Sequence, residues 1–334
     1  MATSMRSILR GVKGRKAVRL VVSILLIAAL SYLIDWPNVL SIAVTASWEW
    51  LLAAIACVLA ARACITLRWS LLLRVGGDRW PFWRLFGIVS AGIGLGSLLP
   101  TSVGPDVTRG YLLHSERRGD RSTTGTAVVS SLLLDRYMAT MGTLLVGIGG
   151  AFAVGQTMIG LFLLAALIGV AGVTALLLSS AGALIKAITP GALAKLRPKL
   201  EAVLAALRAP GMLWRGAAPA IVSSTAMTLF RTGAFVCVYH ALGYPVPLAL
   251  ACFAIPLMLI ALMAPVTIGG FGVREWLLVI GFESAGVPPE VSVSVGILFF
   301  ALQILVSLPA VAQTLSQRWR ADRPVAADAT KSTE

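Results

Sequence analysis

Charged residues sit well inside long apolar stretches of the sequence at Arg62, Asp135, Arg136 and Arg231. If these stretches cross a membrane, each charge costs at least about 2.5–3.5 kcal/mol on insertion scales, so such residues face a partner or a polar cavity. Two roles are open. Asp135 pairs with Arg62 or Arg231 and holds helices together, or the excess of arginine binds an anionic headgroup at membrane depth.

Two further apolar regions, at about 82–114 and 247–283, are each interrupted by proline and glycine near the middle. Where a helix restarts after such a break, its free N–H groups and the positive end of its dipole form an anion-binding site. A phosphate suits that environment. The residues that mark the breaks are Pro100, Gly104, Pro265, Gly269 and Gly270.

An arginine follows each of these two prolines by nine residues, at Arg109 and Arg274. Asp106 is placed to cap the restarted helix or to lie in its first turn. Arg109, one turn later, can pair with Asp106 or bind a phosphate, and Glu275 stands beside Arg274 in the same way. The side chains predicted to bind a headgroup are Arg62, Arg109, Arg231 and Arg274, and those predicted to position them or to form ion pairs are Asp106, Asp135, Arg136 and Glu275.

The composition indicates the solvent of these helices. Of 334 residues, 58% are hydrophobic and 13% are charged, and the mean hydropathy is +0.88. A soluble domain carries roughly 25% charged residues. A water-soluble surface needs polar cover that this chain lacks. The sequence therefore predicts an all-α polytopic membrane protein.

Six apolar runs reach the roughly 20 residues that a hydrocarbon core requires. They lie at about 18–35, 50–73, 124–151, 157–179, 215–240 and 290–314. The legs of the two broken regions are too short to span, so each region is predicted to be a re-entrant helical hairpin. The predicted organisation is a basic N-terminus at 1–17, a membrane domain at 18–315 containing an amphipathic surface segment at 182–208, and a tail at 316–334.

The formal net charge of +14 is unevenly placed. The connections at 35–49, 152–157, 241–247 and 283–290 contain no Lys or Arg, whereas the other connections and both termini are basic. The positive-inside bias then predicts cytoplasmic termini in a bacterial inner membrane.

This topology gives each half of the chain, at about 18–151 and 157–315, three crossings and one hairpin. Three is an odd number, so the second half must run upside down relative to the first. Inverted repeats with broken helices are typical of secondary transporters.

Several function classes lack their sequence signals. There is no basic stripe interleaved with aromatic residues, so nucleic acid is not an expected partner. The four cysteines form no CxxC pair and no Cys/His cluster, and no nucleotide-binding, zinc or nucleophile motif is present. We expect no catalytic residue, metal or cofactor. The GxGxG run at Gly92, Gly94 and Gly96 is better explained by close helix packing.

The two breaks and the following span resemble a known family. Residues 99–109 match the LPxxxGxDxxR segment of the lysylphosphatidylglycerol synthase transmembrane family, Asp135 and Arg136 resemble its [DE]R span, and residues 265–275 match its Px[ST]xGGxGxRE segment. The order and spacing match along essentially the whole chain. Pro105 is a departure, because the family more often has glycine there.

The resemblance implies a flippase-like membrane domain that handles a lipid, without the soluble aminoacyl-transferase domain of bifunctional members. We therefore expect a lipid translocase, not an enzyme, that moves an anionic or zwitterionic lipid by alternating access. Alternatives are a secondary transporter of a small solute, or a non-transporting membrane subunit that recruits a lipid-modifying enzyme. An integral membrane transferase would need an acidic or His cluster that the sequence lacks. Membrane lipids are the expected partners, and the oligomeric state is left open.

Overall fold

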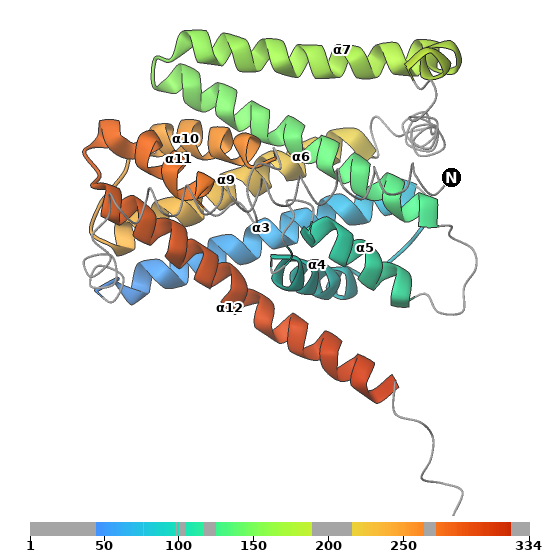
Figure 1. Cartoon of the computed structure of the whole chain (residues 1–334), viewed down its shortest axis with the longest axis horizontal. Coiled ribbons are helices and arrows are strands. Elements are labelled where there is room, and N and C mark those ends of the chain that lie inside the picture. The colour runs from blue at the N-terminus through green and yellow to red at the C-terminus, as the bar shows by residue number, and fades with distance from the viewer. Residues whose placement is uncertain are drawn as a thin grey trace, which may run out of the picture.

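The computed structural model describes residues 45–75, 77–97, 99, 104–116, 125–188, 216–263 and 272–321. Within these ranges the chain is helical and contains no strand (Figure 1). The elements are α3 (Trp48–Val75), α4 (Phe82–Ser97), α5 (Gly104–Glu116), α6 (Gly125–Ala153), α7 (Thr157–Ile188), α9 (Ala218–Ala241), α10 (Leu248–Ala261), α11 (Val273–Phe282), the short 3-10 helix η3 (Glu283–Ala285) and α12 (Pro289–Ala321).

Three of the described helices are long and apolar enough to cross a membrane: Trp48–Arg74, Ala218–Ala241 and Pro289–Ser316. They coincide with three of the predicted spans. The predicted spans at 124–151 and 157–179 also fall on single helices, α6 and α7. The predicted first span at 18–35 and the basic N-terminus lie outside the described residues, as do most of segment 182–208 and the end of the tail.

Two helices extend beyond the predicted boundaries. Helix α7 continues to Ile188, into the segment predicted to lie on the membrane surface, and α12 continues to Ala321. Both extensions are free of proline, so no residue in them removes a backbone donor from the helix.

Both broken regions form two short helices, as the Pro/Gly pattern predicted. Helix α4 ends at Ser97 and α5 begins at Gly104; α10 ends at Ala261 and α11 begins at Val273. Figure 1 shows α4 and α5 toward one end of the molecule and α10 and α11 toward the other. The break residues Pro100, Pro265, Gly269 and Gly270 lie outside the described residues, and Gly104 is the first residue of α5.

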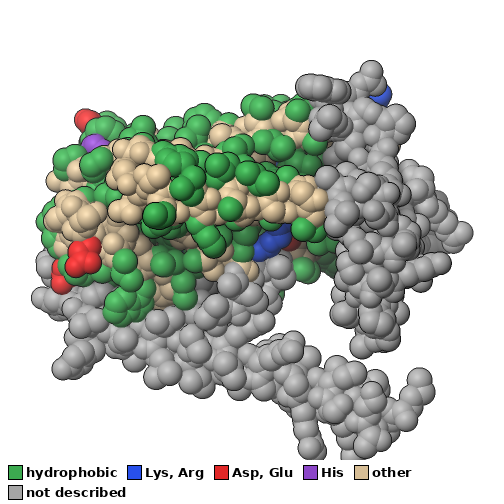
Figure 2. Space-filling model, turned by 90° about the horizontal axis from the view of Figure 1, so that it is seen from above, with side chains coloured by type: hydrophobic (Ala, Val, Ile, Leu, Met, Phe, Trp, Pro, Cys, Tyr) green, Lys and Arg blue, Asp and Glu red, His purple; other side chains and the backbone are tan. Residues whose placement is uncertain are grey.

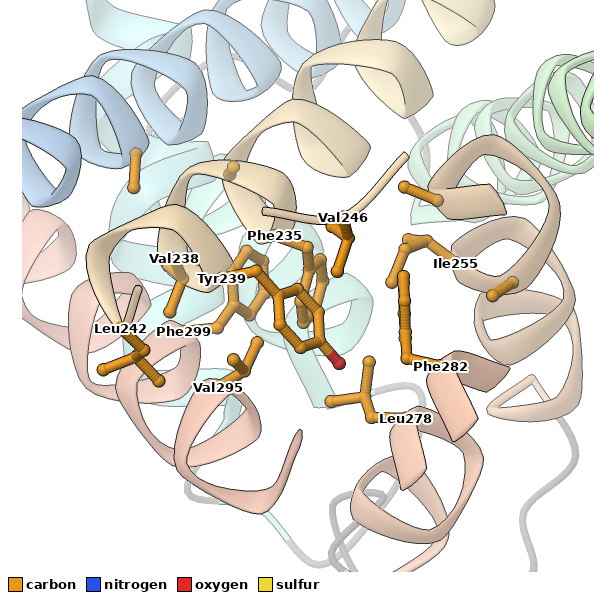
Figure 3. Close-up of a cluster of buried hydrophobic side chains, with 14 of the residues drawn as sticks. Phe235, Val238, Tyr239, Leu242, Val246, Ile255, Leu278, Phe282, Val295 and Phe299 are labelled. Carbon is orange, nitrogen blue, oxygen red and sulfur yellow. The ribbon is translucent and has the colours of Figure 1, made fainter. Parts of the chain in front are cut away.

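The helices pack around a central pair, α3 and α9. Helices α3 and α9 make the most extensive contact, α4 packs on α12, and α10 packs on α6. Figure 3 shows a cluster of buried apolar side chains, to which α9, α11 and α12 contribute. In it the rings of Phe235 and Phe299 stack with centroids 3.9 Å apart, and Tyr239 donates a hydrogen bond to Ser292 Oγ at 3.2 Å. Close packing and such polar contacts are what hold helices together in lipid.

The outside of the bundle is apolar. Figure 2 shows a face covered mainly by hydrophobic side chains, with most of the visible acidic side chains at one end. In the span window of α3, 33% of the residues are buried inside the molecule, so the apolar side chains that stay exposed need lipid as solvent.

Glycines allow the close approach between α4 and its neighbours, as predicted for the GxGxG run. A Cβ added to Gly94 would lie 2.6 Å from Ser307 Cβ on α12, and one added to Gly92 would lie 2.8 Å from Arg109 Cβ on α5. Neither neighbour can move without shifting a helix.

The variant Gly94→Ala is therefore expected to lower the free energy of unfolding by about 1–3 kcal/mol, because it overpacks the α4–α12 contact. Gly87 on the same helix has nothing within 4 Å of an added Cβ, so Gly87→Ala is the matched control. The control should be neutral or stabilising by up to about 1 kcal/mol, as expected for glycine to alanine in a helix. Unfolding in detergent measures both, and equal values for the two variants would contradict the packing role.

Candidate functional site

A cavity of about 350 Å³ lies where eight helices meet, with lining residues from α3, α4, α5, α6, α9, α10, α11 and α12. Its wall is mostly apolar and carries a concentrated set of charges. The charged lining residues are Arg68, Asp106, Arg109, Asp135, Arg136, Arg231 and Arg274.

Asp135 on α6 is the centre of a buried ion-pair network. Its carboxylate accepts two hydrogen bonds from Arg68 of α3, at 2.6 and 3.1 Å, and one from Arg109 of α5, at 2.5 Å. All three side chains are buried. The Arg109 guanidinium also lies 5.0 Å from the ring centroid of Trp69, a cation–π contact. Asp135 thus ties three helices together at one wall of the cavity.

Asp106 extends the network to the edge of the cavity. It lies in the first turn of α5, one of the two positions predicted for it. One carboxylate oxygen contacts Arg109 at 2.9 Å and the other contacts Arg136 at 2.6 Å. The side chains of Asp106 and Arg136 are 26% and 31% exposed, so this pair stands at the boundary between cavity and surface.

The predicted partners of Asp135 were wrong. The sequence offered Arg62 or Arg231, whereas the structure pairs Asp135 with Arg68 and Arg109. Arg68 was missed altogether, although it lies in the same apolar run as Arg62. A charge within that run was the available signal.

Arg62 does not line the main cavity. It is buried against α12, where its Nη2 donates to the Gln303 carbonyl at 2.6 Å and to Ser307 Oγ at 2.8 Å. Its Nε and Nη1 have no hydrogen-bond partner among the described residues. Arg62 and Arg231 share a small adjoining void of about 10 Å³, too small for a headgroup. Among the predicted headgroup ligands, Arg62 is the one that the structure sets apart.

Arg231 on α9 differs from the other arginines of the cavity. It is half-buried, and its guanidinium makes no hydrogen bond or ion pair with another described residue. Its positive charge is therefore left unneutralised inside a low-dielectric site. A planar guanidinium in that position attracts an anion whose oxygens accept hydrogen bonds, such as a carboxylate or a phosphate.

Arg274 and Glu275 begin α11 on the opposite side of the cavity. Arg274 donates to Glu275 Oε1 from Nη2 at 2.6 Å and from Nε at 3.0 Å. The other carboxylate oxygen of Glu275 accepts a hydrogen bond from Gly272 N–H at 2.8 Å, which caps the helix. Gly272 has a φ of +84°, a conformation that glycine adopts without strain. The cap thus fixes Glu275, and Glu275 orients Arg274.

The balance of charge gives the cavity its chemical character. Five arginines and two aspartates line it, and Glu275 stands behind Arg274. The aspartates are occupied by Arg68, Arg109 and Arg136, and Glu275 is occupied by Arg274, so Arg231 is the lining arginine that lacks a carboxylate partner among the described residues. Within the described part of the chain, no group of three or more His, Cys, Asp or Glu side chains could hold a metal ion. The arrangement can bind an anion such as a phosphate.

The LPxxxGxDxxR segment therefore contributes Asp106 and Arg109 to the cavity, and the following span contributes Asp135 and Arg136. The GGxGxRE segment contributes Arg274 and its partner Glu275. A family model described as the lysylphosphatidylglycerol synthase TM region matches residues 16–310. The chain belongs to the lysylphosphatidylglycerol synthase transmembrane family. No curated protein matches it significantly.

Membership of the lysylphosphatidylglycerol synthase transmembrane family makes the chain a multi-pass membrane protein related to lipid metabolism. The match also covers residues 16–44, which precede the described helices, and so includes the predicted first span. The two segments by which the sequence resembled the family both contribute charged residues to one cavity. They are separated by more than 150 residues in the chain and meet only through the fold.

Proposed function

We propose that this member of the family is a lipid translocase that moves an anionic or zwitterionic phospholipid between membrane leaflets. The observation that carries the proposal is the guanidinium of Arg231, which has no partner among the described residues and lies in a cavity whose carboxylates are already paired. A phosphodiester supplies the missing negative charge and oxygens that accept charge-assisted hydrogen bonds. Arg274, oriented by Glu275, supplies a second contact from the opposite wall.

An inverted repeat would give this cavity two alternative openings. The packing supports it, because α4 against α12 and α10 against α6 are the contacts that an exchange of the two halves interconverts. The opposite placement of the α4–α5 and α10–α11 pairs in Figure 1 has the same implication. We take the full domain to consist of six spans and two re-entrant hairpins, in a bacterial inner membrane with cytoplasmic termini.

Transport then follows from the electrostatics of the two halves. The headgroup enters the cavity from one leaflet and its phosphate neutralises the arginines, which lowers the penalty for closing the site around them. Movement of one hairpin-containing half against the other opens the site to the opposite leaflet. This scheme requires no bond to be made or broken, so we propose a transporter and not an enzyme.

A secondary transporter of a small anionic solute would use the same cavity. Lipid dependence separates the two functions, since only a lipid leaves its acyl chains in the membrane while its headgroup crosses.

The test is a lipid-accessibility assay on the purified protein in liposomes that contain fluorescent lipids of different headgroups. Protein-dependent exposure of inner-leaflet anionic phospholipid supports the proposal, and repeating the assay with a proton gradient identifies the driving force. Uptake of soluble phosphate esters without movement of any lipid would instead favour the solute transporter. If Arg231→Ala and Arg274→Ala both moved lipid normally, the headgroup site would be wrong.

A further inference from the structure

A second hollow lies between α5 and α6, next to the charged cavity. It has a volume of about 410 Å³ and is lined mainly by apolar residues, together with Asp106, His114 and Arg136. Several of these, including Val107, Tyr111 and Leu133, are exposed large side chains on the outside of the described helices. The remaining apolar lining residues are Gly110, Val128, Val129 and Leu132. This groove between α5 and α6 has the shape and polarity of a site for a hydrocarbon chain.

The groove and the charged cavity share two residues, Asp106 and Arg136. These two side chains form an ion pair at 2.6 Å, and both are partly exposed. The pair therefore separates a compartment suited to a phosphate from one suited to an acyl chain. A phospholipid has these two parts joined at its glycerol backbone, whereas a small soluble anion has only the first.

We propose that the groove between α5 and α6 holds an acyl chain of the phospholipid whose phosphate lies in the cavity, and that the Asp106–Arg136 ion pair opens to admit that phosphate. This inference rests on the proposed function and adds to it the lateral path by which the lipid enters. The groove is the membrane side of that path, and the ion pair is its gate.

The charges at the gate allow such an exchange. Asp106 contacts Arg109 through its other oxygen at 2.9 Å, so it keeps a cationic partner when Arg136 turns away. Arg136 meets an incoming phosphate oxygen in place of the carboxylate and also keeps an anionic partner. Since no charge is left unpaired at either stage, the opening avoids the penalty of an isolated buried charge.

The test uses two photoreactive lipids with the same diazirine-bearing acyl chain, a phosphatidylglycerol and a diacylglycerol without phosphate. The full chain is labelled in phosphatidylcholine liposomes, and the labelled peptides of α5 and α6 are quantified by mass spectrometry. We expect several-fold more labelling of the groove by the phosphatidylglycerol. Leu305 on α12, 53% exposed and outside the groove, should be labelled equally by both lipids.

Two variants sharpen the result. Arg136→Gln should remove the excess labelling by the phosphatidylglycerol, because the gate no longer binds the phosphate. Leu133→Trp fills the groove and should lower its labelling, while Leu305→Trp should leave groove labelling unchanged. Equal labelling of the groove by the two lipids in the unaltered chain would overturn the inference, and so would an unchanged excess in Arg136→Gln.

The outcomes also separate this inference from the proposed function. Phosphate-dependent labelling of the groove in a chain that translocates no lipid would support the groove site and refute the translocase. Translocation of lipid with phosphate-independent labelling would support the translocase and refute the groove site.

Discussion

Replacing Asp135 with asparagine is expected to lower the free energy of unfolding by about 3–5 kcal/mol, the range found when one partner of a buried ion pair is removed. Asp135 is 1% exposed and accepts hydrogen bonds from both Arg68 and Arg109. Asparagine has the shape of aspartate but no charge, and its NH2 group is a hydrogen-bond donor that would face the two guanidinium donors. Two guanidinium groups would then lie close together, with only Asp106 still paired to one of them.

The matched control is Glu116→Gln. Glu116 pairs with Arg84 at 2.7 Å, a distance like that between Asp135 and Arg68, but the two side chains are 28% and 58% exposed. An exposed pair contributes about 1 kcal/mol or less, so Glu116→Gln should have little effect. Unfolding of both variants in the same detergent measures the difference. If Asp135→Asn were as stable as Glu116→Gln, the ion-pair network would not hold α3, α5 and α6 together.

The sequence predicted the helices well wherever composition alone decides them. A membrane-spanning helix satisfies its own backbone hydrogen bonds, so an apolar run that is long enough to cross the membrane has one stable form in lipid. The runs at 50–73, 124–151 and 215–240 accordingly became α3, α6 and α9. The proline–glycine clusters at Pro100 and Pro265 likewise separated helices, because proline removes a backbone donor.

The pairing of the charges could not be predicted from the same pattern. Which arginine meets Asp135 depends on how α3, α5 and α6 are rotated about their axes, and a helix that is apolar on all sides carries no periodicity that fixes its rotation. Small residues such as Gly92 and Gly94 set the contacts instead, and their partners on other helices are not evident in the sequence. Hence most of the charged residues that line the cavity were singled out by residue type, whereas Arg68 was missed and Arg62, a predicted headgroup ligand, lies outside the cavity.

Replacing Arg231 with glutamine is expected to slow lipid translocation by about tenfold to a hundredfold, since a hydrogen bond to a charged group contributes roughly 1.5–3 kcal/mol. The free energy of unfolding of the same variant should equal or exceed that of the unaltered chain. Arg231 has no partner among the described residues, so its removal breaks no ion pair and relieves the penalty of a desolvated charge. A loss of transport without a loss of stability is the signature of a ligand-binding side chain.

Two other arginine variants serve as comparisons for Arg231→Gln. Arg84→Gln removes an exposed charge outside the cavity and should leave both transport and stability unchanged. Arg68→Gln should reduce both, because Arg68 lines the cavity and also holds Asp135. Transport is measured as the initial rate of lipid exposure in liposomes, and stability as unfolding of the same preparations. If Arg231→Gln transported lipid normally but unfolded more easily, Arg231 would be a structural residue. Arg274 could not take over this role, because its carboxylate partner Glu275 already neutralises its charge. The case for an anionic ligand in the cavity would then be lost.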